Sequence, residues 1–142
     1  KAYFEKFPGI RKYMDETKAF AKENLFVKTA FGRKLHLKEM GSKNGAQRAF
    51  AERQAINAPI QGSAADIIKR AMIAMPDALA AKKLDAKMLL QVHDELVFDL
   101  HESEAGVLIP MITEAMQIAL PLPNGVPIKV DTGMGANWLE AH

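Results

Sequence analysis

The 142-residue sequence contains no cysteine, which excludes disulfides and thiolate metal sites. It also lacks any apolar run close to the roughly 20 residues that a membrane-spanning helix needs. The basic, aromatic amino terminus does not resemble a signal peptide. We therefore expect no membrane partner, and an intracellular location is the natural default for a chain without cysteine.

The composition is that of a globular domain, with 49% hydrophobic and 25% charged residues. The length corresponds to about one domain with a substantial core. The chain starts at Lys1, inside a stretch that is predicted to be helical. We accordingly expect it to be a piece of a longer polypeptide.

Charge is distributed unevenly along the chain. Residues 1–53 carry 13 Lys and Arg against 6 Asp and Glu, a formal charge of +7, whereas residues 54–142 carry 6 against 11, a charge of −5. A basic half beside an acidic half suits a phosphate-rich ligand on one side and cations on the other. Solvated helices without a ligand also produce such a difference, so charge alone leaves both interpretations open.

Residues 88–99 are predicted to form a β-hairpin with an acidic tip. Two apolar runs rich in Val, Leu and Phe flank the polar triplet His93-Asp94-Glu95, a pattern typical of buried strands joined by a tight turn. A turn fixed by packed strands can present a positioned metal ligand. Acidic residues are also common in solvated turns, so this stretch by itself favours the plain interpretation.

The amino-terminal third is predicted to be a helix over residues 1–24 with a break near Pro8, followed by short strands at 25–29 and up to Leu37. The aromatic residues of the helix are expected to pack in a core. Arg33, Lys34 and Lys38 cluster around the turn between the strands. They would either keep a hairpin edge soluble or contact phosphate.

Two helices are predicted in the middle of the chain, at about 46–57 and 63–81. Pro59 is expected to stop or kink the first of them, Pro76 to bend the second, and Ser63 to cap the second. Helix 103–120, capped by Ser103, and a strand at 127–131 follow the hairpin. The predicted fold class is α+β, an antiparallel sheet with the acidic-tipped hairpin at its centre, covered by helices.

Arg53 and Asn57 lie four residues apart on one side of the first of these helices, and Gln61 follows the proline. All three side chains donate hydrogen bonds. Every base pair presents acceptors in the minor groove, so such donors can contact DNA without reading its sequence. The alternative is that Asn57 and Gln61 satisfy backbone groups freed at a proline break.

Taken together, residues 91–97 (Gln-Val-His-Asp-Glu-Leu-Val) and residues 52–66 resemble the carboxy-terminal part of a family A DNA polymerase, of the bacterial DNA polymerase I type. The resemblance extends over essentially the whole chain. It implies that residues 1–40 are the end of the fingers subdomain and that residues 41–142 are the carboxy-terminal half of the palm. It also implies a cytoplasmic, nucleoid-associated bacterial protein.

The resemblance further implies roles for individual residues. Asp94 would be a ligand of catalytic Mg²⁺ in a two-metal site, and Glu95 its supporting acidic neighbour. The partners would be primer-template DNA, a dNTP and the rest of the polymerase chain, which would supply the other metal-binding Asp and the residues that clamp triphosphate. The fragment alone is therefore expected to fold but not to polymerise. The residues expected to contact DNA are Arg33, Arg53, Asn57, Gln61 and His93.

Two other functions are considered. A non-catalytic DNA-binding module derived from a polymerase would keep the donor-bearing helix and the basic turn, and its affinity would fall steeply with salt. A His-Asp metal hydrolase would use His93 and Asp94 but needs further His ligands. The remaining histidines, His36, His101 and His142, show no helical pairing with that site.

Overall fold

The computed structural model describes residues 2–141 and divides into two compact units, residues 1–63 and 64–142. Helix α3, Gly45–Lys82, contributes its first half to one unit and its second half to the other. The chain is mostly helical with two small antiparallel sheets, which confirms the α+β class. No helix in the described part of the chain is long and apolar enough to cross a bilayer.

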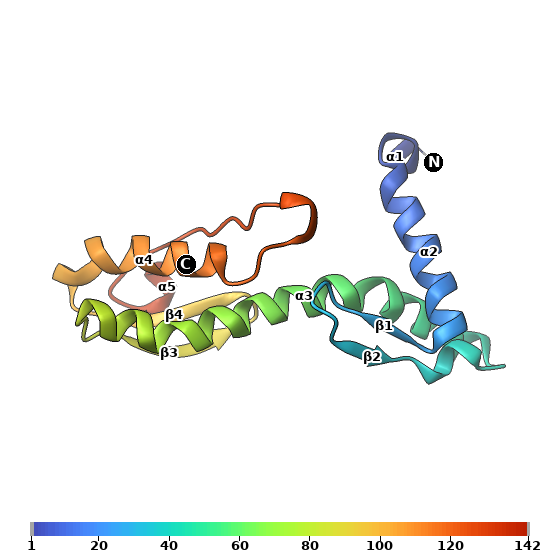
Figure 1. Cartoon of the computed structure of the whole chain (residues 1–142), viewed down its shortest axis with the longest axis horizontal. Coiled ribbons are helices and arrows are strands. Elements are labelled where there is room, and N and C mark those ends of the chain that lie inside the picture. Colours follow the sequence, from blue (N-terminus) through green and yellow to red (C-terminus); the bar gives the residue numbers. More distant parts are fainter. Residues whose placement is uncertain (1, 142) are drawn as a thin grey trace. The chain divides into compact units, whose positions relative to one another are not determined.

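The first unit begins with α1, Ala2–Lys6, and α2, Pro8–Asn24, so the predicted break near Pro8 is confirmed. Leu25 ends α2 in a left-handed conformation and leads directly into a hairpin of β1, Phe26–Lys28, and β2, Lys34–His36. A 3₁₀ turn, Lys38–Gly41, precedes α3. Figure 1 shows the hairpin beside the first half of α3.

The core of the first unit lies where α2, the hairpin and α3 meet. It consists of small and medium apolar side chains, which let the elements approach closely: Ala21, Val27, Leu37, Met40, Ala51 and Ala55. The aromatic residues that were expected to fill a core are only in part buried, with Phe4 and Tyr13 half-buried. Tyr3, Phe7 and Phe20 are between 41% and 57% exposed, because the helix face turned to the core carries Ala21 instead.

The second unit contains the predicted central hairpin, formed by β3, Lys87–Val92, and β4, Glu95–Asp99. Its apolar core joins the hairpin to the end of α3 and to α4, Ala105–Ile118, through Met75, Leu79, Ala86, Leu108 and Ile112. The expectation that both strands of this hairpin are largely buried is wrong among the described residues. Leu89 and Leu90 on β3 are 57% and 44% exposed, whereas all residues of β4 except Asp99 are half-buried.

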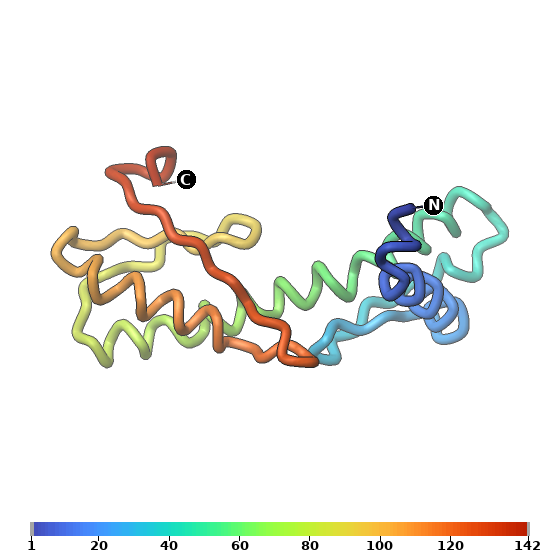
Figure 2. Tube along the Cα trace, turned by 90° about the horizontal axis from the view of Figure 1, so that it is seen from above, coloured from blue at the N-terminus to red at the C-terminus, as the bar shows by residue number. Residues whose placement is uncertain are grey.

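The carboxy-terminal part differs from the prediction in two places. Ser103 lies within a 3₁₀ turn, Glu102–Glu104, rather than capping α4. Residues 127–131 are not a strand, because the extended chain from 126 to 135 has no strand partner among the described residues. It follows the 3₁₀ turn Pro123–Gly125 and leads to α5, Trp138–Ala141 (Figure 2).

The two predicted central helices are one continuous helix, and this is the main correction to the fold. Helix α3 runs through both Pro59 and Pro76 without ending. Pro59 leaves the Ala55 carbonyl without its helical donor, yet the helix continues. One turn later, the Ser63 hydroxyl donates to the Pro59 carbonyl at 2.5 Å. Ser63 is therefore an interior residue of α3, buried at 8% exposure, and not its cap.

Candidate nucleic-acid interface and acidic turn

Asp94 occupies a two-residue turn between two paired strands. Val92 and Glu95 are the last paired residues on either side of it, so the turn consists of His93 and Asp94. His93 has a φ of 51°, a left-handed conformation that non-glycine residues seldom adopt outside turns. The Gln91 side-chain amide donates to the His93 carbonyl and ties the turn to β3. The exposed Asp94 carboxylate is thus presented to solvent from a turn held on both sides.

Glu95 does not share the tip with Asp94. It is the first residue of β4, paired with Val92, and it is half-buried. Carboxylate oxygens are the ligands that Mg²⁺ prefers, so Asp94 fits a magnesium ligand by chemistry and exposure. Within residues 2–141 no three His, Asp or Glu side chains gather closely enough to hold a metal ion. His142 lies outside the described residues.

Arg53, Asn57 and Gln61 form a single row on α3, here called the donor row. Because α3 is uninterrupted, residues four apart lie about one turn apart along the helix axis. Each of the three side chains is rotated by about 40° around the axis relative to the preceding one. All three residues are exposed. The Arg53 guanidinium lies over the Phe50 ring, 5.8 Å from its centroid. The three donors of the donor row therefore lie along one uninterrupted helix.

Asn57 and Gln61 do not satisfy backbone groups at a break. Neither side chain has a hydrogen-bond partner in the described part of the chain. The polar side chain that bonds at Pro59 is Ser63. Its hydroxyl donates to the Pro59 carbonyl and accepts from the Ala30 amide at 2.8 Å. The donors of Asn57 and Gln61 therefore remain open to an external partner.

Arg33 is brought to the donor row by the turn of the first hairpin. Its Nη2 donates to the Gly62 carbonyl at 2.9 Å. Gly62 directly follows Gln61, the last residue of the donor row. The Thr29 hydroxyl accepts from the Phe31 and Arg33 amides and shapes this turn. A Cβ on Gly62 would lie 2.6 Å from the Thr29 methyl, so a glycine is what allows the turn to reach α3.

Sequence reasoning missed the residues that place Arg33 next to the donor row. These are Thr29, Gly62 and Ser63. The sequence contained a signal for Gly62, because an isolated glycine within a helical pattern indicates close packing. Nothing in the sequence alone indicates which turn packs there.

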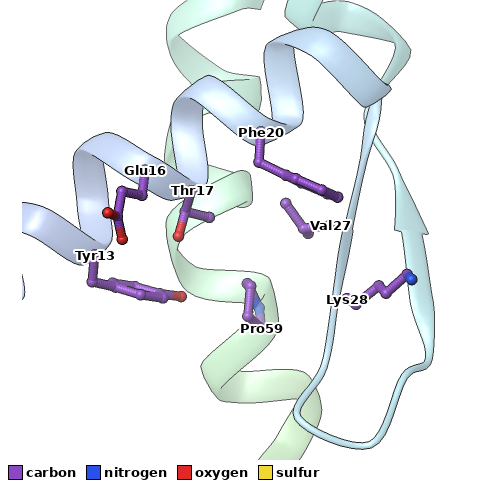
Figure 3. A pocket seen from close by; sticks show the side chains of 7 residues that line it. All are labelled: Tyr13, Glu16, Thr17, Phe20, Val27, Lys28 and Pro59. Atoms are coloured by element: carbon purple, nitrogen blue, oxygen red, sulfur yellow. The ribbon is translucent and has the colours of Figure 1, made fainter.

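A hollow of about 320 Å³ lies elsewhere in the first unit, between α2, β1 and Pro59. Figure 3 shows Tyr13 and Phe20 reaching into it from α2, while the Lys28 side chain extends away from it. The Tyr13 hydroxyl donates to the Ile56 carbonyl at 2.8 Å. Burial raises the pKa of Tyr13, and a hydrogen bond with Thr17 lowers it in part. The hollow holds none of the predicted site residues.

A sequence profile described as DNA polymerase family A matches residues 1–140. The chain belongs to DNA polymerase family A.

Individual relatives agree with this assignment. The chain is 50% identical over 145 residues to DNA polymerase I of Pseudomonas aeruginosa, covering 99% of the chain and 15% of that protein. It is 49% identical over 146 residues to DNA polymerase I of Rhizobium leguminosarum, covering 100% of the chain and 14% of that protein. It thus spans about one-seventh of the length of these relatives.

A solved structure is similar over nearly the whole chain. The POL domain of Pol1 from M. smegmatis, in complex with DNA primer-template and dNTP, is 45% identical with a TM-score of 0.93. The match covers 98% of this chain and 24% of that one. The fold of the chain is therefore that of a polymerase POL domain fragment.

Proposed function

We propose that the chain is the carboxy-terminal part of a DNA-directed DNA polymerase, which transfers deoxynucleotides from dNTPs to a primer 3′ end and releases pyrophosphate. The observation that carries this proposal is the exposed Asp94 carboxylate in a turn fixed by β3, β4 and Gln91. Family membership supports the same reaction. Transfer of a nucleotidyl group requires positioning and charge stabilisation more than a covalent partner from the protein.

Asp94 is proposed to hold Mg²⁺, with Glu95 as its supporting neighbour. When bound, the metal activates the attacking hydroxyl and neutralises charge that develops on phosphate. Two ions in such a site need more carboxylate than one turn provides. A second metal-binding Asp is therefore proposed to come from the rest of the polymerase chain, outside residues 1–142.

The donor row is proposed to lie along the minor groove of the primer-template duplex. Arg53, Asn57 and Gln61 present donors at one-turn intervals, and each base pair offers purine N3 or pyrimidine O2 as an acceptor. Arg33, held at Gly62, would contact the same duplex. His93, next to Asp94, would lie near the primer end. Contacts of this kind recognise correctly shaped DNA and leave its sequence unread.

The subdomain assignment and the setting of the protein belong to the same proposal. Residues 1–40 would be the end of the fingers and residues 41–142 the carboxy-terminal half of the palm. The exposed apolar side chains of Leu89 and Leu90 give the rest of the polymerase chain a surface to pack on. A cytoplasmic, nucleoid-associated location in a bacterial cell belongs to the same proposal.

The test is primer extension by the complete polymerase that contains this chain, comparing Asp94→Ala with Asp99→Asn. Asp94→Ala should lower kcat at least about 100-fold, since a lost metal ligand removes several kcal/mol of charge stabilisation. Asp99→Asn removes an equally exposed carboxylate at the far end of β4 and should leave kcat within about twofold. Full activity of Asp94→Ala would refute the assignment.

A non-catalytic DNA-binding module is the second candidate function. It is favoured by one observation, namely that the donor row and Arg33 are complete while residues 2–141 hold only part of a metal site. In that case the complete protein would bind duplex DNA with a steep salt dependence, and Asp94→Ala would change neither binding nor any extension activity.

A further inference from the structure

One face of the first hairpin carries two lysines directly opposite each other. Lys28 pairs with Lys34, and Phe26 pairs with His36. Opposed residues of an antiparallel pair share a face, and so do residues two apart on a strand. These four side chains therefore lie on the same side of the β1–β2 ribbon, opposite to the buried Val27, and are here called the Phe26 face.

Like charges opposed across a ribbon are unfavourable. Both ammonium groups lie over the Phe26 ring, Lys34 at 4.5 Å and Lys28 at 5.7 Å from its centroid, so one ring serves both cations. Among residues 2–141 neither lysine has a carboxylate partner, whereas Lys12 and Lys18 on α2 pair with Glu16 and Asp15. An external anion would relieve the repulsion that the chain itself leaves uncompensated.

The anion that fits this face is a nucleic-acid strand rather than free phosphate. Residues 26–38 contain four Lys and Arg and no Asp or Glu. The Phe20 ring meets Phe26 edge-on at 5.5 Å and is 43% exposed, and the His36 ring lies 6.1 Å from Phe26. Cations alternating with exposed rings are the combination that binds single strands, because the cations meet phosphates and the rings meet bases.

The Phe26 face lies alongside the donor row, because Val27 and Leu37 of the ribbon share a core with Ala51 and Ala55 of α3. The turn end of the ribbon touches α3 at Gly62, beside Gln61, through Arg33. From there the pair Lys28 and Lys34 comes first, and the pair Phe26 and His36 follows. We propose that the Phe26 face binds the unpaired template strand where it leaves the primer-template duplex. This inference rests on the proposed function.

The experiment measures the affinity of the complete polymerase for two DNA substrates, a blunt duplex and the same duplex with a 5′ template overhang of ten nucleotides. The double variant Lys28→Gln/Lys34→Gln should weaken binding of the overhang substrate and leave the blunt duplex unchanged. Two lost phosphate contacts on a single strand lower the salt slope of log K by about 1.4, so the defect should shrink about sevenfold between 50 and 200 mM salt.

Matched controls separate this surface from general charge and from folding. Lys12→Gln/Lys18→Gln makes the same charge change on α2 and should leave both affinities unchanged. Phe26→Leu should weaken overhang binding about fivefold, because it removes the ring that both ammonium groups lie over. Phe7→Leu removes another partly exposed ring that has a lysine over it and should have no effect.

Three results would overturn the inference. The first is an equal loss of affinity for the blunt duplex, which would place the lysines on the duplex. The second is an overhang affinity matching that of the α2 control variant. The third is a loss seen only on a substrate with a displaced non-template strand. Failure of the parent polymerase to bind the blunt duplex would instead refute the proposed function.

Discussion

At the scale of single residues, Gly62 is the position where α3 tolerates no side chain. A Cβ there would lie 2.6 Å from the Thr29 methyl and 3.2 Å from Arg33 Nη2, so the turn that carries Arg33 would have to move. Gly106 in α4 provides the opposite case, because a Cβ would meet nothing within 4 Å. A side chain at Gly62 would thus meet the hairpin turn, whereas one at Gly106 would meet open space.

We expect Gly62→Ala to lower the free energy of unfolding by about 1–3 kcal/mol, the usual cost of overpacking. Gly106→Ala should leave stability unchanged or raise it by up to about 1 kcal/mol, since alanine favours a helix. Urea unfolding of the two variants and the parent measures both effects. A Gly62→Ala variant as stable as Gly106→Ala would show that the turn does not press against α3.

At this scale the sequence identified the residues with exposed chemistry better than those that position them. Asp94 could be placed because apolar runs flank it, and the structure puts it at the tip of the turn. The roles of Asp94 and of the donor row stay predictions. Ser63 was predicted to cap a helix, because its hydrogen bond with the Ala30 amide joins segments about thirty residues apart, which no local pattern encodes. The role of Thr29 was not predicted, although its hydroxyl bonds stay within its own turn.

At the scale of elements, α3 shows how tertiary context overrides a local rule. Pro59 and Pro76 both predicted ends or bends, yet one helix spans Gly45–Lys82. The Ser63 hydroxyl donates to the Pro59 carbonyl and accepts from the Ala30 amide, so the hairpin is tied to α3 beside the proline. Helices and hairpins were predictable from periodicity, whereas the continuity of α3 through its prolines was not.

A second contact on α3 predicts a pH effect. The Tyr13 hydroxyl of α2 donates to the Ile56 carbonyl of α3, and burial raises the pKa of Tyr13 above its ordinary value of about 10. A tyrosine whose pKa is raised by folding stabilises the native state fully below its unfolded pKa. That contribution is lost as the pH rises through the folded pKa.

Tyr13→Phe should therefore lower the free energy of unfolding by about 0.5–1.5 kcal/mol at pH 7. Between pH 9 and 11 the parent should lose stability more steeply than the variant, so the two should converge. Urea unfolding across this range is the measurement. Tyr3→Phe, at an exposed position, is the matched control and should track the parent at neutral pH. Parallel pH curves for parent and Tyr13→Phe would contradict the predicted coupling.

At the scale of the whole molecule, the predicted functional residues are divided between two compact units. Arg33 and the donor row belong to residues 1–63, and the acidic turn belongs to residues 64–142. Overall class and hairpin position were predictable from the sequence. The strand predicted at 127–131 is absent from both sheets. Ile128-Lys129-Val130 has strand periodicity, and the sequence does not show that the segment has no strand partner among the described residues.

The same division decides what residues 1–142 can do without the rest of a polymerase. Their carboxylates do not complete a metal site, since residues 2–141 hold no group of three metal-ligating side chains, yet the donor row and Arg33 are intact. We expect the isolated chain to bind duplex DNA with an affinity that falls steeply with salt, and to give no primer extension with Mg²⁺ and dNTPs.

Primer extension assays with the isolated chain and its Asp94→Ala variant provide the measurement, with the complete polymerase as the positive control. Extension by both forms of the isolated chain would indicate a contaminating polymerase, because removal of Asp94 should abolish any activity of its own. Extension by the parent chain that disappears in Asp94→Ala would contradict the prediction. It would mean that Asp94 and Glu95, with other carboxylates of residues 1–142, suffice to hold the catalytic metal ions.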